Sequence, residues 1–166
     1  MTNDAQLLAE LERQHAAQAL LHEYQRLVDA KDIDGLAEIV VPDVVLARQD
    51  GESRGAEQFL NLYRKFAASD VQVAHHMVTN VEARELPADG DARVVRVDSC
   101  FLAITTHASG EARFVWGRYS DDMVRTAERW KIAAKRIAVV RTAFVDSLAP
   151  LAMNSFGPRQ TEDAVR

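Results

Sequence analysis

The chain has 166 residues, of which 48% are hydrophobic and 27% are charged, and its formal net charge is -5. This length suits one domain, because two domains would each be too small to bury a good core. The acidic balance argues against a nucleic-acid partner, which needs clustered positive charge, and no apolar run is long enough for a membrane span. No signal peptide is visible between Met1 and Glu12, and the single cysteine, Cys100, excludes an internal disulfide. We therefore expect a cytoplasmic protein.

Helices are expected first along the chain. Apolar residues recur at helical spacing from Asp4 to Ala30, with charged residues between them. Asp32 is placed as the N-cap of a second helix over 33–39. Pro42 and Asp43 end that helix, and the pattern then predicts a short strand at 44–46, a hairpin tip at 49–53 and a third helix over 56–67.

Long strands occupy the second half of the sequence. Strand patterns cover 71–86, 92–106, 111–125 and 129–145, with turn residues between them. Strands of this length in an antiparallel meander must twist and curl. The predicted fold is α+β, a strongly curved, mostly antiparallel sheet that forms a cone covered by three N-terminal helices. We expect this domain to span 1–150, a partly disordered tail to span 151–166, and a small apolar pocket to lie between sheet and helices.

The end of the first helix carries a carboxylate where apolar residues are expected. Asp29 follows Leu27 and Val28, which must face the core, and it lies at the negative end of the helix dipole. A carboxylate in this position is a candidate for acid–base chemistry. Exposure to solvent in the link between two helices is the simpler interpretation, and the residues alone favour it.

Two adjacent histidines, His75 and His76, begin the first long strand. Neighbouring residues on a strand point to opposite faces, so only one of them can enter a pocket. Counting in twos puts the more apolar set on the side of His75, which favours His75 facing the packed or convex side. A histidine near Asp29 would form an acid–base dyad, whereas a core histidine with a satisfied hydrogen bond is equally consistent with the pattern.

Other candidates are aromatic or charged residues on the later strands. Phe101 and Trp116 are expected as walls of the pocket or core. Asp98 could line the pocket, and Arg141 could reach an acidic ligand or an interface, but an exposed sheet surface explains both more simply. The sequence has no phosphate loop, no dinucleotide fingerprint and no metal-ligand spacing, so no cofactor and no metal are expected.

These residues carry a family resemblance. Tyr24-x-x-x-x-Asp29, His76-Met77-Val78-Thr79-Asn80, Gly117-Arg118-Tyr119 and Trp130-Lys131-Ile132-Ala133 resemble the SnoaL-like group of the nuclear-transport-factor-2-like (cystatin-like cone) superfamily. Similar enzymes include scytalone dehydratase and bile acid 7α-dehydratase, which abstract a proton with an aspartate–histidine dyad and no cofactor. The resemblance implies Asp29 and His76 as the dyad, in preference to His75, with Tyr24 assisting. It gives Asp98 and Arg141 no secure role.

Two functions follow from the resemblance. The first is a cofactor-independent lyase or isomerase acting on a small apolar cyclic molecule. The second is a non-catalytic role, either as a structural subunit or as a small-molecule-binding domain. The structural role is considered because Trp130 to Ile137 also resembles the small subunit of ring-hydroxylating dioxygenases. The Val- and Ile-rich back of the sheet favours a homodimer or homotrimer.

Overall fold

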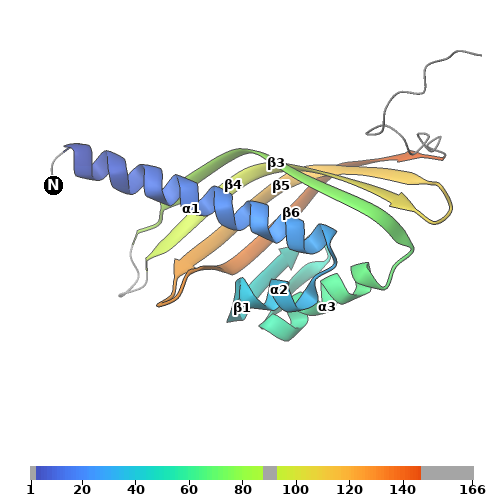
Figure 1. Cartoon of the computed structure of the whole chain (residues 1–166), viewed down its shortest axis with the longest axis horizontal. Coiled ribbons are helices and arrows are strands. Elements are labelled where there is room, and N and C mark those ends of the chain that lie inside the picture. Colours follow the sequence, from blue (N-terminus) through green and yellow to red (C-terminus); the bar gives the residue numbers. More distant parts are fainter. Residues whose placement is uncertain (1–2, 88–92, 147–166) are drawn as a thin grey trace, which may run out of the picture.

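Figure 1 shows a long helix laid across one face of a curved sheet in the computed structural model, which describes residues 3–87 and 93–146. The helices are α1 (Asn3–Asp29), α2 (Ile33–Glu38) and α3 (Ala56–Ala67). The strands are β1 (Val40–Arg48), β2 (Gly51–Arg54), β3 (Val71–Glu85), β4 (Val94–His107), β5 (Ala112–Arg125) and β6 (Trp130–Val145). The predicted α+β class is confirmed, and the expected tail at 151–166 lies outside the described residues.

The six strands form one open sheet in the order β2-β1-β6-β5-β4-β3. β3 to β6 pair as the expected antiparallel meander, whereas β1 pairs with β6 in parallel. β1 begins at Val40, before Pro42, and the segment expected as a hairpin tip overlaps the short strand β2. Pro42 is tolerated because the β1–β6 pairing is irregular between Val40 and Val45, so no ladder hydrogen bond is needed there.

The core lies between the sheet and the helices, on what we call the inner face. α1 buries Leu20, Leu21, Tyr24 and Val28 there. The leucines at its start behave differently from the expectation of a continuous buried stripe. Leu7, Leu8 and Leu11 are each more than half exposed, because the first turns of α1 extend past the sheet (Figure 1).

Several bulges change which face the strands present, and two of them bear on the site. In β3, Thr79 pairs with Cys100 but Glu82 pairs with Asp98, so β3 holds one extra residue, and Asn80 adopts a positive φ of 54°. In β6, Ile132 and Ala134 face consecutive residues of β5, so Ala133 is extra. Each bulge makes residues three positions apart point to the same face.

No helix in the described ranges is both long and apolar enough to cross a membrane.

Candidate functional site

Asp29 and His76 meet where the end of α1 reaches the edge of the sheet. Asp29 Oδ1 lies 2.5 Å from His76 Nδ1, and Asp29 Oδ2 accepts the backbone N–H of His76 at 2.9 Å. A carboxylate only accepts hydrogen bonds, so His76 donates through Nδ1 and keeps Nε2 as its basic nitrogen. Their side chains are 21% and 13% exposed. The pair is therefore shielded but still within reach of a ligand.

Of the two adjacent histidines, His76 faces the helices and His75 is exposed on the other face. The count in twos favoured the opposite arrangement because it assumed an unbroken strand. The inward residues are His76 and Val78 before the bulge, and Val81 and Ala83 after it. The apolar residues counted together with His75 therefore belong to two different faces.

The same pair also has a structural role. β3 is an edge strand. The backbone N–H and C=O groups on its free side, away from β4, form hydrogen bonds with side chains of α1 and of the residues just after it. Gln14 donates to the Val81 carbonyl at 2.7 Å and accepts from the Ala83 N–H at 3.0 Å, while Lys31 donates to the Val71 carbonyl at 2.6 Å. Asp29 adds its bond to the His76 N–H to this series. We call these contacts the edge clamp.

Tyr24 lies deeper, in a cluster of buried tyrosines. Its hydroxyl shares a hydrogen bond of 2.9 Å with Tyr63 of α3, and its ring packs edge-on against Tyr119 of β5. Burial raises the pKa of all three phenols well above the usual range, so each stays protonated near neutral pH. Phe101 stacks on Tyr119 with 4.3 Å between ring centroids, and it links this cluster to β3 through its pairing with Val78.

A buried ion pair, which the sequence analysis missed, completes the inner face. Lys135 Nζ lies 2.9 Å from Asp121 Oδ2, and both side chains are fully buried. The ammonium also lies 4.0 Å from the Tyr24 ring centroid and 3.7 Å from that of Tyr119. Burial raises the pKa of Asp121 and lowers that of Lys135, and their mutual attraction opposes both shifts. The bulge at Ala133 turns Lys135 inward. Strict alternation from Ile132 would point Lys135 to the outer face, so the sequence pattern does not predict its burial.

Three buried polar atoms have no hydrogen-bond partner within the described residues: Gln25 Nε2, Ser99 Oγ and Asp121 Oδ1. Ser99 is directly opposite Tyr119 in the sheet, and Asp121 is two residues further along the same face of β5. Buried polar groups normally find a partner in protein or water. The inner face thus has unused hydrogen-bonding capacity beside the tyrosine cluster.

The other residues expected at the site do not join Asp29 and His76. Asp98 accepts hydrogen bonds from Arg84 and Ser120 on the outer face of the sheet, and Trp116 and Arg141 pair with each other across strands on that same face. Adjacent strand residues point to opposite sides, and the buried Ser99 and Gly117 take the inward direction. Of the four expected pocket residues, only Phe101 faces inward.

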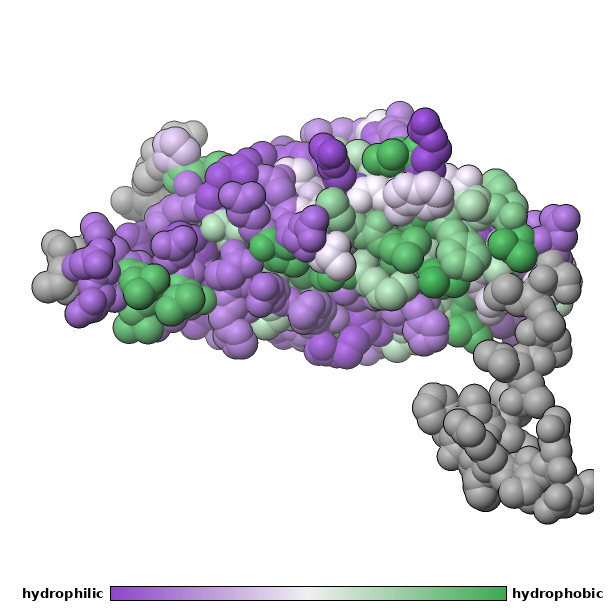
Figure 2. Space-filling model, turned by 90° about the horizontal axis from the view of Figure 1, so that it is seen from above, coloured by the Kyte–Doolittle hydropathy of each residue, from purple (hydrophilic) through white to green (hydrophobic). Residues whose placement is uncertain are grey.

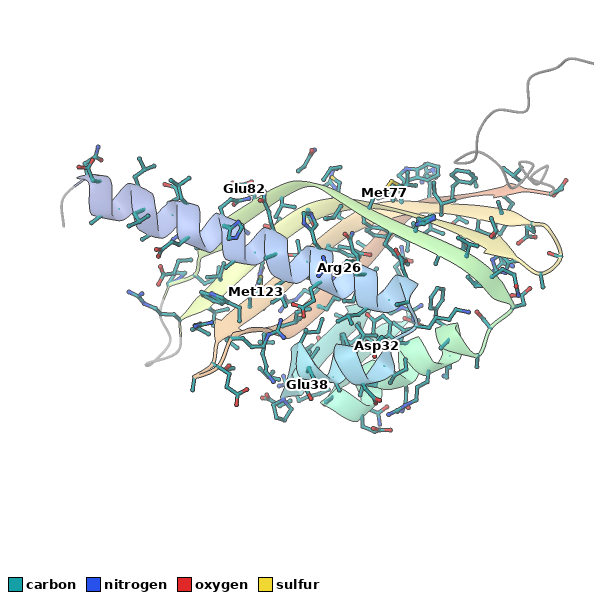
Figure 3. All side chains as sticks on the ribbon, in the orientation of Figure 1. Arg26, Asp32, Glu38, Met77, Glu82 and Met123 are labelled. Carbon is teal, nitrogen blue, oxygen red and sulfur yellow. The ribbon has the colours of Figure 1, made fainter. Side chains whose placement is uncertain are left out.

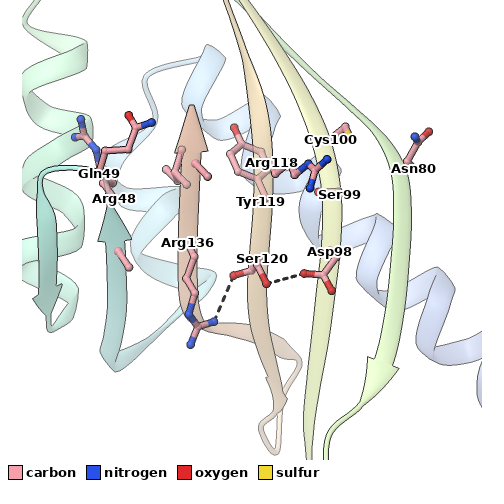
Figure 4. Close-up of a pocket in the computed structure, with 13 residues that line it drawn as sticks. Arg48, Gln49, Asn80, Asp98, Ser99, Cys100, Arg118, Tyr119, Ser120 and Arg136 are labelled. Atoms are coloured by element: carbon pink, nitrogen blue, oxygen red, sulfur yellow. Dashed lines mark hydrogen bonds between the residues drawn. The ribbon is translucent and has the colours of Figure 1, made fainter. Parts of the chain in front are cut away.

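A hollow of about 640 Å³ lies on the outer face, away from the dyad. Asn80, Asp98, Cys100, Arg118, Ser120 and Arg136 line it together with parts of β1 and β6 (Figure 4). Asp29, His76 and Tyr24 take no part in it. In the described part of the chain, no group of three or more His, Cys, Asp or Glu side chains is placed to hold a metal ion.

A curved open sheet crossed by a long N-terminal helix is the architecture of the nuclear-transport-factor-2-like superfamily, and the family match and the solved structures agree with it. The chain belongs to the family of the SnoaL-like domain, whose model matches residues 9–136. A comparison with curated proteins found no significant match.

Solved structures share the fold. A scytalone dehydratase-like protein from Novosphingobium aromaticivorans is 17% identical, with a TM-score of 0.71 over 89% of this chain and 93% of that one. The hexachlorocyclohexane dehydrochlorinase LinA-type3 from Novosphingobium barchaimii is 20% identical, with a TM-score of 0.72 over 87% and 99%. An aromatic ring hydroxylase-like protein from Novosphingobium aromaticivorans is 21% identical, with a TM-score of 0.69 over 81% and 94%.

Proposed function

We propose that the protein is a cofactor-independent lyase or isomerase that removes a proton from a small, apolar cyclic substrate. The contact between Asp29 Oδ1 and His76 Nδ1 carries this proposal, because it leaves His76 with a single free basic nitrogen. The His76 ring lies edge-on to Phe66 of α3, with 6.3 Å between ring centroids. This apolar neighbour favours a substrate whose atoms next to His76 are apolar carbon atoms rather than charged groups.

In the proposed reaction His76 Nε2 takes a proton from a carbon atom of the substrate. The electron pair of the broken C–H bond forms a new double bond, and a leaving group on the neighbouring carbon departs with its own bonding pair. A departing hydroxide takes up the proton that His76 Nε2 accepted and leaves as water, which returns His76 to its neutral form. Asp29 holds the ring and balances the charge on the imidazolium that forms. Such a base contributes on the order of 10²–10⁴ in rate.

Tyr24 supports this chemistry from within the core. As a neutral phenol with a raised pKa it keeps a proton to donate to oxygen, and its hydrogen bond with Tyr63 fixes the position of its hydroxyl. Lys135, which lies over the same ring, supplies a positive charge on the inner face. We assign Tyr24 to steadying the departing or developing oxygen, with Phe101 as an apolar wall of the substrate site.

A ligand screen followed by a turnover assay tests the proposal. Hydroxylated polycyclic compounds that raise the melting temperature would be incubated with the enzyme, and elimination followed by the absorbance of the new double bond. His76→Gln should reduce kcat by about 10²–10⁴. His75→Gln changes the neighbouring side chain on the opposite face and should leave kcat unchanged. Equal loss in both variants, or turnover that persists in His76→Gln, contradicts the assignment.

A non-catalytic role is the second candidate, and the edge clamp favours it. Asp29 forms a hydrogen bond with the edge strand as Gln14 does, so the pair would have a structural purpose without any chemistry. In that case the domain binds a small molecule or serves as a structural subunit of a dioxygenase. Asp29→Asn keeps an acceptor for the His76 N–H, so it should preserve stability in either case. Loss of turnover in this stable variant would favour the enzyme over the structural role.

We further propose that the chain forms a homodimer or homotrimer, as expected from its apolar sheet surface. Large apolar side chains remain exposed on β3, β5 and β6. Analytical ultracentrifugation of the purified chain tests this, and a monomer at about 100 µM would contradict it.

A further inference from the structure

The outer face of the sheet changes from apolar to charged along its strands, and Figure 2 shows the two kinds of surface side by side. Met77, which rises from this face in Figure 3, stands in one row with Leu102 and Trp116 across β3, β4 and β5. Two rows further along, Asp98 of β4 pairs with Ser120 of β5. The hollow of about 640 Å³ occupies the rows next to the apolar one. A ligand in the hollow therefore meets both kinds of surface.

Of the arginines among the described residues that line the hollow, Arg118 differs from the others. Arg48 Nε lies 3.4 Å from Asp50 Oδ1, and Arg136 Nη2 lies 2.8 Å from Asp122 Oδ2, so both are already paired. Arg118 makes no hydrogen bond or ion pair within the described residues, and its side chain extends from β5 toward β4 in Figure 4. The hollow therefore holds a guanidinium whose donors are free for a ligand.

An acidic side chain at the edge of the hollow limits which anion Arg118 can bind. Asp98 accepts hydrogen bonds from Ser120 at 2.6 Å and from Arg84 at 2.5 Å. Hydrogen bonds to the ionised form favour it, so Asp98 keeps a negative charge beside the hollow. A doubly charged phosphate meets more repulsion there than a single carboxylate does. A planar carboxylate also matches the parallel donors of a guanidinium, so a monocarboxylate is the better partner for Arg118.

The part of the hollow next to Arg118 is apolar. Cys100 and Ala138 stand beside Arg118 in the same row, on β4 and β6, and Ala47 of β1 also lines the hollow. These short side chains offer no strong hydrogen-bonding group to a ligand. Trp116 lies two residues from Arg118 on the same face of β5 and is 40% exposed. A flat apolar body can therefore lie on this part of the sheet while a charged group reaches the guanidinium.

We propose that the hollow binds a small monocarboxylic acid with a flat apolar body. The carboxylate pairs with Arg118, and the body lies over Cys100 and Ala138 toward Trp116. The volume of the hollow is within the range of about 300–1,000 Å³ that is usual for small-molecule sites. An inorganic anion would satisfy Arg118 but leave the apolar part of the hollow unused. The site lies on the face opposite His76, so it does not depend on the proposed reaction.

Calorimetric titration of the full chain tests the site, with benzoate as the probe. Neutral benzamide has the same ring and acetate has no ring, and each should bind about tenfold more weakly than benzoate. Arg118→Gln should weaken benzoate binding by about tenfold or more, because it removes a charge-assisted contact. Arg26→Gln is the matched control. It removes an exposed arginine of α1 that lies away from the outer face (Figure 3), and it should leave benzoate binding unchanged.

Cys100 provides a second readout, because it is the only cysteine of the chain and it lines the hollow. Benzoate should slow the reaction of Cys100 with neutral iodoacetamide, followed by mass spectrometry, in wild type and in His76→Gln but not in Arg118→Gln.

Several results overturn the proposal. The first is the absence of benzoate binding at about 10 mM. The second is binding that is lost in His76→Gln but kept in Arg118→Gln, which places the ligand at the dyad instead. The third is acetate or phosphate that binds as tightly as benzoate, which makes the hollow a general anion site. A hollow closed by a second copy would leave Cys100 unreactive with and without benzoate, and this result also contradicts the proposal.

Discussion

At the scale of single residues, the buried pair of Lys135 and Asp121 makes the most demanding contact in the molecule. Both side chains are removed from water, and the remaining oxygen of Asp121 has no partner within the described residues. Desolvation of two charges costs several kcal/mol, and their attraction offsets that cost only while both are present. The two tyrosine rings that flank Lys135 add to the attraction. The pair therefore stabilises the fold only as a unit.

Removal of one partner should be much worse than removal of both. Lys135→Met and Asp121→Leu should each lower the free energy of unfolding by about 3–5 kcal/mol, and Lys135→Met/Asp121→Leu by much less than their sum. Urea unfolding followed by circular dichroism measures these differences. Glu57→Gln, which breaks an exposed ion pair with Arg64, is the control and should cost less than about 1 kcal/mol. Additive single and double effects would show that the two charges act independently.

The sequence predicted some of these residues and could not predict others. Asp29 and His76 were reached through the spacing of a family motif, and the structure brings their side chains together. Lys135 was missed because its direction depends on the bulge at Ala133, which no local residue marks. Trp116 was expected as a pocket wall because aromatic residues usually pack, yet its strand presents it outward.

At the scale of elements, the contact between α1 and β3 covers the free edge of the sheet at β3. Edge strands expose unpaired backbone groups that can recruit other chains, and proteins often cover them. Here the edge clamp uses side chains of one helix and the residues after it, from Gln14 to Lys31. The clamp also fixes the distance between Asp29 and β3, so the candidate dyad depends on contacts made four turns earlier in α1.

Loss of Gln14 should therefore loosen the edge strand. Gln14→Ala removes two hydrogen bonds to β3 and should lower the free energy of unfolding by about 1–2 kcal/mol. Hydrogen exchange should quicken at Ala83, whose N–H loses its acceptor. Gln18→Ala makes the same change at an exposed position of α1 and should be neutral or slightly stabilising. Equal exchange rates at Ala83 in the two variants would show that the clamp is not needed.

The helices and long strands were predicted nearly to the residue, since their patterns are long and periodic. The predicted strand at 44–46 was too short, because Pro42 was taken as a break, whereas irregular pairing at Val40 accommodates it. The faces of β3 and β6 could not be predicted, because an alternating pattern contains no information about where an extra residue enters. Burial of the strands in three dimensions determines that position.

At the scale of the whole molecule, the sheet separates two chemically different faces. The inner face holds the dyad, the tyrosine cluster and a buried charge pair, whereas the outer face holds exposed apolar side chains and a network of arginines and aspartates. The three tyrosines join α1, α3 and β5, so their ionisation reports on the core as a whole.

Alkaline pH should destabilise the fold through these tyrosines. Their pKa values are raised in the folded state, so stability is complete below pH of about 10, the value for an unfolded tyrosine, and falls as pH rises and only the unfolded chain ionises. Each phenol should reduce the free energy of unfolding by about 1.4 kcal/mol per pH unit in this range. Urea unfolding at several pH values measures the slope, and Tyr63→Phe should flatten it. Free titration of all three phenols in the folded protein would contradict this.

The bulge at Asn80 determines which face of the sheet the residues on either side of it point to. The extra residue in β3 divides the strand into two segments whose alternation runs out of phase, so His76 points inward in the first segment while Glu82 points outward in the second. Without the bulge, strict alternation from His76 would continue through Asn80 to Glu82. Glu82 would then be driven under α1 and Val81 would face solvent, although no amino acid had changed. The bulge at Asn80 thus gives one strand an inward side for the candidate dyad and an exposed carboxylate on the opposite face.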